Sequence, residues 1–412
     1  MDILNTAAIL ITLAALFSYL NYRFLKIPTT IGIMLISLGI SLGLIILNTM
    51  GFGQFEHYAE RIIGSVDFYE TLMDGMLSFL LFAGALHVNL NDLKQQKWVI
   101  LILATLGVML STFLVGTMTF IILNALGIHM SFIYCLIFGA LISPTDPIAV
   151  MGILKTVGAP KSLEIKIAGE SLFNDGIGVV VFLILVGVAT GTTQPTVENI
   201  SLLLLQEAGG GILFGLMLGL GVFYLLRDID GYQVEVLLSL ALVMGGYAAA
   251  SAMHISGPIT MVVAGLVIGN HGRLFAMSDT TREHLDDFWE LIDEILNAVL
   301  FVLIGLEILL LQFRVEYLLA AIVIIPAVLL ARFISVGIPI QVMRHFRTFS
   351  NKAVEILTWG GLRGGISVAL ALSLPAGEAR EVILTITYAV VVASIVVQGL
   401  TVGPLVAASK ID

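Results

Sequence analysis

Residues 141–148 read Leu141-Ile142-Ser143-Pro144-Thr145-Asp146-Pro147-Ile148, inside an apolar run that extends from 131 to 154. Each proline removes a backbone donor and disfavours helix at the residue before it. We therefore expect an unwound segment around Thr145 and Asp146. Irregular backbone within a membrane is tolerated only where protein packs around it or where it lines a wet cavity. Unwinding also frees carbonyl oxygens, which suit a hard cation. The alternative is a kinked helix whose second half Asp146 merely caps.

The composition excludes a water-soluble protein. Of the 412 residues, 58% are hydrophobic and 12% are charged, and the mean hydropathy is +1.06. A soluble chain has about 25% charged residues. Apolar runs of membrane-spanning length recur from end to end, which predicts an all-α polytopic protein in a lipid bilayer. The net charge of −10 argues against nucleic acid as a partner. The single cysteine, Cys135, excludes an internal disulfide and a Cys-rich metal site, and we expect no cofactor.

We predict about thirteen transmembrane helices in one transmembrane unit, 1–412. They cover residues 5–22, 28–48, 68–88, 98–125, 131–154, 162–190, 202–226, 233–253, 257–271, 288–311, 316–343, 353–374 and 381–407. Because the connections are short, no soluble enzymatic domain is expected, and the chain is not predicted to be an enzyme. The most polar connections are 51–67 and 272–287, and for the second we expect an amphipathic helix on the membrane surface.

The basic residues predict the orientation of the chain. If the spans alternate, fourteen of the 19 Lys and Arg residues fall in the loops on one side and three on the other. The remaining two, Arg332 and Arg363, lie within spans. Cytoplasmic loops carry the excess of Lys and Arg. The pattern predicts a multi-pass protein of the plasma (inner) membrane with its N-terminus outside and its C-terminus in the cytoplasm.

The sixth predicted span carries a polar face. Residues 169–176 read Gly169-Glu170-Ser171-Leu172-Phe173-Asn174-Asp175-Gly176. At about 100° per residue, Glu170, Ser171, Asn174 and Asp175 fit within one arc of about 140°. Burial disfavours the ionised form of a carboxylate, and a nearby cation favours it. A single buried carboxylate can therefore hold either a proton or a cation, and this competition is the minimal machinery of an exchanger. A purely structural polar network is the alternative, and for Glu170 we prefer it.

The twelfth predicted span contains the second expected break. Residues 359–367 read Trp359-Gly360-Gly361-Leu362-Arg363-Gly364-Gly365-Ile366-Ser367. Each glycine disfavours helix by about 1 kcal/mol relative to alanine. Interrupted spans at corresponding positions of two halves point to a transporter site at the membrane midplane. Arg363 would offset the negative C-terminal ends of the half-helices, and Asp146 the positive N-terminal ends. Close packing of helices through glycine is the alternative.

Two further polar features lie in the spans. Arg332 is near the middle of the eleventh span, where a cation needs a partner, and we expect that partner to be Glu170. A face of the tenth span carries Glu290, Asp293, Glu294 and Asn297. This face is either an acidic vestibule that concentrates cations or simply a hydrated helix end.

These motifs resemble those of the NhaP/NHE-type branch of the monovalent cation–proton antiporters. The matching pieces are Ser143 to Pro147, Glu170 to Gly176 and Gly360 to Gly365, and the layout of thirteen spans also fits. The resemblance implies two inverted six-helix repeats, whose fifth and twelfth helices cross at their unwound centres. It implies that the helices of 95–190 and 315–408 form an ion-transporting core, and those of 1–94 and 202–311 a dimerisation domain. A homodimer is therefore expected.

The same resemblance implies the roles of individual residues. Asp175 would bind the cation or the proton, with Asp146, Ser171 and the Thr145 carbonyl as further Na⁺ ligands. Related electrogenic antiporters carry an aspartate where this chain has Asn174, so the resemblance implies electroneutral exchange of one H⁺ for one Na⁺ or Li⁺. A K⁺/H⁺ antiporter or another cation-coupled transporter or channel is the alternative. A remote alternative is an intramembrane aspartyl protease that uses Asp146 and Asp175, but the Gly-x-Gly of that class precedes the aspartate and here follows it.

Overall fold

The computed structural model describes residues 3–51, 64, 67–194, 196–273, 276–311, 314–347, 349 and 352–408. Within these residues the chain is built from helices and turns, and the one β-type contact is an isolated bridge between Asp146 and Leu362. The expected all-α class is therefore confirmed. Most of the polar connection 51–67 lies outside the described residues.

The first half of the chain contains nine of the labelled helices. They are α1 (Ile3–Leu20), α2 (Thr29–Thr49), α4 (Phe68–Glu70), α5 (Leu77–Leu86), α6 (Leu90–Ile102), α7 (Val108–Ala125), α8 (Phe132–Ile142), α9 (Ile148–Val157) and α10 (Lys161–Ala189). Short π-helical turns extend α1 to Leu25, join α4 to α5 and join α6 to α7. Each of these joined pairs therefore forms one continuous helix.

The second half follows the same pattern. Its helices are α11 (Val197–Leu204), α12 (Gly210–Arg227), α13 (Tyr232–Ala252), α14 (Gly257–Val267), α16 (Asp279–Glu307), α17 (Val315–Met343), α18 (Ala353–Trp359), α19 (Gly365–Leu372), α20 (Glu378–Ala393) and α21 (Gly399–Ala408). Similar π-helical turns join α11 to α12 and α20 to α21, and extend α14 to Gly272.

Each of the thirteen predicted spans overlaps helix in this structure. In the described part of the chain, 8 continuous helices are long and apolar enough to cross a membrane. The third, fifth, ninth, tenth and twelfth predicted spans are not among them, and the fifth and twelfth are interrupted. The separate surface helix expected at 272–287 is not observed. Residues from Asp279 onward are the first turns of α16, which begins at a Ser278 cap where the hydroxyl accepts from Thr281 N at 3.3 Å.

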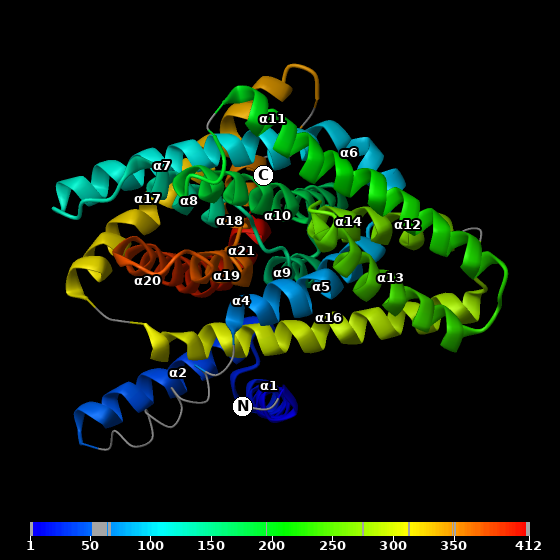
Figure 1. Ribbon diagram of the computed structural model, residues 1–412. Helices are drawn as coiled ribbons and strands as arrows, with labels where there is room; N and C mark the ends of the chain where they lie inside the picture. Colours follow the sequence, from blue (N-terminus) through cyan, green and yellow to red (C-terminus); the bar gives the residue numbers. More distant parts are fainter. Residues whose placement is uncertain are drawn as a thin grey trace.

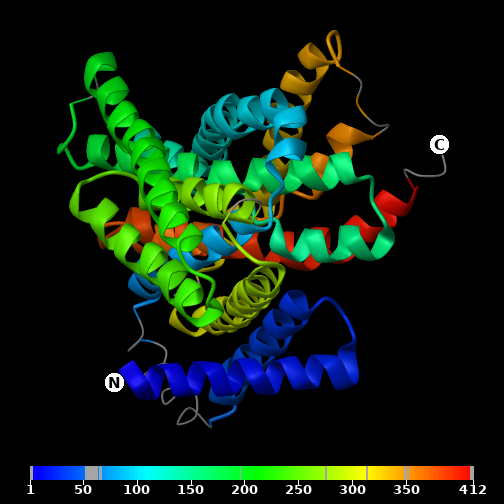
Figure 2. The same ribbon diagram turned by 90° about the vertical axis from the view of Figure 1, so that its right-hand side faces the viewer.

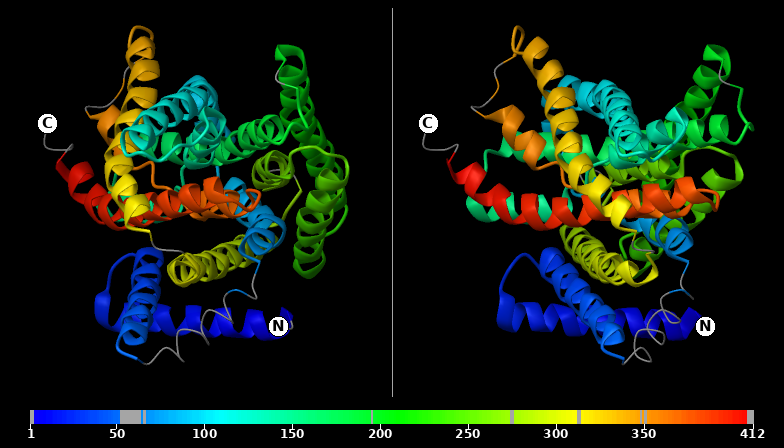
Figure 3. Two further views of the ribbon diagram at one scale, coloured as in Figure 1. Left: turned by 60° about the vertical axis from the view of Figure 1, so that its left-hand side comes forward. Right: turned by 90° about the vertical axis from the view of Figure 1, so that its left-hand side faces the viewer.

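The helices pack in two groups. One group contains α1, α2, α5, α12, α13, α14 and α16, with α16 packed on α1, α2, α5 and α13. The other contains α6 to α10 and α17 to α21, where α8 packs on α7 and α10, and α17 on α7 and α20. In Figure 1, α1 and α2 lie below α16 at one edge of the molecule. The side view in Figure 2 shows the same edge layer. Figure 3 shows α16 (yellow-green) between this blue pair and the red helices α20 and α21.

Candidate functional site

Two interrupted helices meet at the centre of the second group. The first interruption separates α8, which ends at Ile142, from α9, which begins at Ile148. The second separates α18, which ends at Trp359, from α19, which begins at Gly365. The Asp146 backbone N–H donates to the Leu362 carbonyl oxygen at 2.8 Å, in an antiparallel bridge. The two unwound segments are therefore in direct contact. Each provides a hydrogen-bond partner for a backbone group of the other that has no partner within its own helix.

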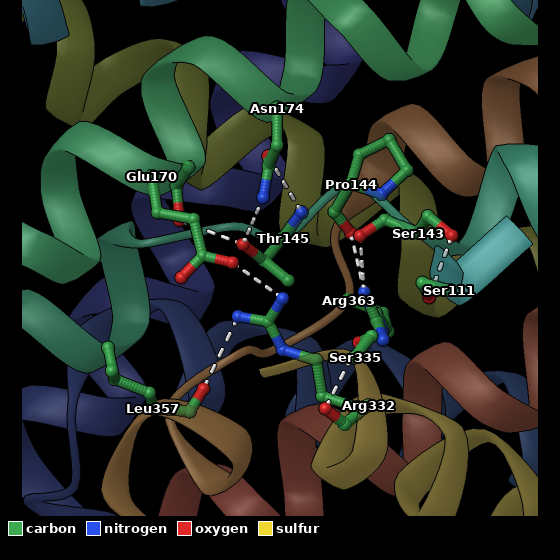
Figure 4. Close-up of polar contacts among 11 residues, drawn as sticks. Ser111, Ser143, Pro144, Thr145, Glu170, Asn174, Arg332, Ser335, Leu357 and Arg363 are labelled. Carbon is green, nitrogen blue, oxygen red and sulfur yellow. Dashed lines mark hydrogen bonds and ion pairs between the residues drawn. The ribbon is translucent and has the colours of Figure 1, made fainter. Parts of the chain in front are cut away.

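Arg363 binds the carbonyl groups at the first interruption. Its Nη1 donates to Ser143 O at 2.6 Å and to Pro144 O at 3.1 Å. These carbonyls follow the C-terminal end of α8, where the helix dipole is negative. The Arg363 guanidinium thus offsets the negative C-terminal end of α8 and provides a donor to the Ser143 and Pro144 carbonyl oxygens. Figure 4 shows Arg363 pointing at these carbonyls.

The second interruption is supported by polar side chains that sequence reasoning missed. The backbone N–H of Arg363 donates to Ser394 Oγ at 3.1 Å, and Ser394 Oγ donates to Gln398 Oε1 at 2.6 Å. Gln398 Nε2 in turn donates to Trp359 O at 3.1 Å. Ser394 and Gln398 lie one helical turn apart in the last predicted span, and two polar residues at that spacing in an apolar run are the signal that could have identified them.

Asn174 and Ser171 fasten α10 to the first interruption. Asn174 Oδ1 accepts from Thr145 N at 3.2 Å, and Asn174 Nδ2 donates to Thr145 Oγ1 at 2.8 Å. The Ser171 and Thr145 hydroxyl oxygens are 2.9 Å apart. All three residues are buried. The Asn174 amide therefore accepts one hydrogen bond from Thr145 and donates another to it. Only a side chain with both an acceptor and a donor can make this pair of bonds.

Glu170 and Arg332 form a buried ion pair at the edge of the same polar face of α10. Arg332 Nη1 lies 2.6 Å from Glu170 Oε1, and the two side chains are only 5% and 2% exposed. Arg332 Nη2 also donates to Leu357 O in α18, at 3.3 Å. A Cβ atom at Gly361 would lie 2.8 Å from Arg332 Nε, so a glycine is needed there for the guanidinium to fit. The pair joins α10, α17 and α18, as Figure 4 shows.

Asp175 and Asp146 line a cavity of about 1380 Å³. Asp175 is 8% exposed, and its carboxylate has no hydrogen-bond partner among the described residues. Asp146 lies within electrostatic range of it. The cavity continues past Lys161 and Glu164, at the first turn of α10, and α16 supplies another part of its wall.

The structure brings the eight predicted site residues together in three arrangements. Asp175 and Asp146 lie on the cavity, and Thr145, Ser171 and Asn174 form the network beside them. Glu170 pairs with Arg332, and Arg363 binds the interrupted backbone. The polar face of α10 is thus divided. The Asp175 carboxylate lies on the cavity, and the Glu170 carboxylate is paired with the Arg332 guanidinium.

Two crossing interrupted helices beside a buried carboxylate define the class of secondary transporters with discontinuous helices. Residues 10–408 match the family described as "Sodium/hydrogen exchanger, transmembrane". The chain belongs to this family and is a multi-pass membrane protein.

Relatives with known names cover almost the whole chain. The Na⁺/H⁺ antiporter NhaP of Pseudomonas aeruginosa is 54% identical over 407 residues, which are 98% of this chain and 96% of that protein. The Na⁺/H⁺ antiporter NhaH of Halobacillus dabanensis is 36% identical over 400 residues, with 93% and 92% covered. The structure of the sodium proton antiporter MjNhaP1 from Methanocaldococcus jannaschii at pH 8 superposes with a TM-score of 0.74 at 21% identity, over 98% of this chain and 99% of that one. The fold of this chain is therefore the fold of MjNhaP1.

Proposed function

We propose that this protein is a secondary active Na⁺/H⁺ antiporter, a transporter that needs no cofactor. The observation that carries the proposal is Asp175, a carboxylate on the cavity without a hydrogen-bond partner in the described chain, while the polar groups around it are paired. An unpaired carboxylate at this depth needs a proton or a cation. The names of the relatives, two of them Na⁺/H⁺ antiporters at 54% and 36% identity, agree with this chemistry.

The transported cation binds at Asp175. Further oxygen ligands are the Asp146 carboxylate, the Ser171 hydroxyl and the Thr145 carbonyl. Carboxylate, hydroxyl and carbonyl oxygens suit a hard cation such as Na⁺ or Li⁺. Proton and cation compete for the same carboxylate, because the charge of one removes the need for the other. Arg363 and the Glu170–Arg332 pair hold the surrounding backbone and do not contact the ion.

Transport follows from movement of one helix group against the other. The helices of 95–190 and 315–408 form the moving core, and those of 1–94 and 202–311 form a dimerisation domain that joins two copies. The packing supports this division, because contacts within each group are extensive and few helix pairs, such as α10 with α14 and α16 with α19, connect the groups. The empty ionised site is disfavoured in transit, since a bare buried carboxylate is costly.

The exchange is electroneutral, with one H⁺ for each Na⁺ or Li⁺. Asn174 is neutral and buried beside Thr145, so the site carries no further aspartate at this position. Exchange of one H⁺ for one Na⁺ moves no net charge across the membrane, so the membrane potential neither drives nor opposes it. The protein lies in the inner membrane with its N-terminus outside and its C-terminus in the cytoplasm. In that orientation Lys26 and Lys161, which line the cavity, belong to cytoplasmic loops, so the cavity would open to the cytoplasm. K⁺/H⁺ exchange is the alternative that the cation panel below distinguishes.

The test is cation-dependent proton flux in proteoliposomes. Addition of Na⁺ or Li⁺ should collapse an imposed pH gradient, K⁺ should not, and clamping the membrane voltage with an ionophore should leave the rate unchanged. Asp175→Asn and Asp175→Ala should abolish the flux. The exposed carboxylate variant Glu316→Gln, in the first turn of α17, is the control and should retain it. Full exchange by either Asp175 variant would overturn the site assignment, and a voltage-dependent rate would overturn electroneutrality.

A further inference from the structure

The wall of the cavity opposite the interrupted helices belongs to α16. Asp293 and Asn297 both line the cavity, one helical turn apart, together with the exposed residues Glu290 and Glu294. Asp293 lies within electrostatic range of Asp146. Because α16 packs on α1, α2 and α5, this wall belongs to the helix group that does not contain Asp175. The cavity therefore has polar oxygen groups on both sides of the boundary between the two groups.

Asn297 is an unusual residue in this wall. It is 2% exposed, and its Nδ2 donates to the Asp293 backbone oxygen at 2.8 Å. Only the nitrogen of the amide can donate to a carbonyl, so this bond sets which end of the amide is the oxygen. Asn297 Oδ1 is buried and has no hydrogen-bond partner among the described residues. A buried acceptor left without a partner destabilises the folded protein, and such groups in native proteins call for a specific explanation.

We propose that Asp293 and Asn297 form a second cation subsite, where the ion binds between solvent and Asp175. This inference rests on the proposed function and names a step of it. The Asn297 amide lies beside the Asp293 carboxylate, to which its nitrogen donates. In the proposed subsite, that carboxylate and the unpartnered Asn297 Oδ1 contact one ion. The ligands match the chemistry of a hard, partly hydrated monovalent cation: a carboxylate, a neutral amide oxygen and water from the cavity.

Because of its position, the subsite should affect ion binding from only one side of the membrane. It lies on one helix group and Asp175 on the other, so the two sites share a cavity only while that cavity is open. An ion at Asp293 also reduces the repulsion between the Asp293 and Asp146 carboxylates, which makes the approach of a cation to Asp175 more favourable. The subsite therefore acts on cation loading from the side to which the cavity opens, and not on loading from the other side.

A hydrated acidic helix end would attract cations differently. Diffuse attraction depends on the number of charges and is screened by salt. It predicts equal effects of removing Glu290 or Asp293 and no effect of a neutral replacement at Asn297. A subsite instead requires the Asn297 oxygen itself. Asn297→Leu, which replaces one neutral side chain by another of similar size, thus separates the two explanations.

The experiment measures the apparent KM for Na⁺ separately on each side of oriented proteoliposomes. Wild-type exchange is established first, because its absence would contradict the proposed function rather than this subsite. Asn297→Leu and Asp293→Asn should each raise the KM about tenfold on the cavity side, as expected for loss of one ligand to a charged group. The KM on the other side and the maximal rate should stay within about twofold. Glu290→Gln is the matched control and should shift the KM less than Asp293→Asn.

Purification as a monodisperse protein with an unchanged melting temperature shows that a variant is folded. If Asn297→Leu fails this check, Asn297→Ala removes the same oxygen with less bulk. An unchanged KM on the cavity side in the folded Asn297 variant would overturn the subsite. Equal KM shifts for Glu290→Gln and Asp293→Asn, both abolished by high salt, would likewise show that only diffuse attraction operates.

Discussion

Asp146 and Leu362 are joined by one backbone hydrogen bond of 2.8 Å between the unwound centres of two interrupted helices. The bond leaves the Asp146 carboxylate on the cavity that Asp175 also lines. Arg363, the residue after Leu362, binds the two carbonyl groups that precede Thr145. The two interruptions therefore form one hydrogen-bonded unit, and changes in either should affect both.

The first prediction concerns Gly364, beside this contact. A Cβ atom there would lie 2.7 Å from Asp146 Oδ2, so Gly364→Ala must displace the carboxylate or the backbone. Overpacking of this kind costs about 1–3 kcal/mol. We expect a folded protein that exchanges at least tenfold more slowly. The measurement is proteoliposome flux, with Gly39→Ala as control, because nothing lies within 4 Å of a Cβ at Gly39. A wild-type rate in Gly364→Ala would show that the position of Asp146 is not critical.

The second prediction concerns the buried Glu170–Arg332 ion pair. Removal of one partner leaves an uncompensated buried charge, which costs about 3–5 kcal/mol. Glu170→Gln and Arg332→Met should each lower the melting temperature of the detergent-solubilised protein strongly. The double variant Glu170→Leu/Arg332→Met should recover most of the loss, since apolar residues fill the same space without a bare charge. Additive losses in the double variant would contradict this account of the pair.

The third prediction concerns the structural role of Asn174. Asn174→Leu removes both hydrogen bonds to Thr145 and should destabilise the protein by about 1–3 kcal/mol for each buried group left unpaired. Asn174→Asp can still accept from the Thr145 backbone N–H and hydroxyl, so we expect it to be more stable than Asn174→Leu. Thermal unfolding of both variants tests this order, and a less stable Asn174→Asp would contradict it.

The fourth prediction concerns Arg363. Its guanidinium contacts two carbonyl oxygens, at 2.6 Å and 3.1 Å. Lysine keeps the charge without the planar fork of donors, and methionine keeps neither. We expect exchange rates and melting temperatures to fall in the order wild type, Arg363→Lys, Arg363→Met. Equal loss in both variants would indicate that the geometry matters and the charge alone does not.

The spans and the interruptions could be predicted because their causes are local. Membrane-spanning apolar runs identify helices, and the prolines at 144 and 147 and the glycines from Gly360 to Gly365 break two of them. The helix expected at 272–287 is present from Asp279 onward, but it is the beginning of α16 and not an element of its own. Polarity along the chain predicted a helix there but not its continuity with the next span.

The sequence by itself determined the class of protein, the positions of the two breaks and the polar face of α10, because backbone preferences and helical periodicity act between close neighbours. Only the tertiary structure decided which groups meet. Arg363 reaches Ser143 across 220 positions of sequence, and Asn174 reaches Thr145 across 29. The roles of Ser394 and Gln398 also emerged only from packing. Packing likewise decided between the two alternatives for the face with Asn297, because that face lines the cavity. Such contacts depend on how whole helices pack, since a buried polar group takes whichever partner the assembled helices bring within hydrogen-bonding distance.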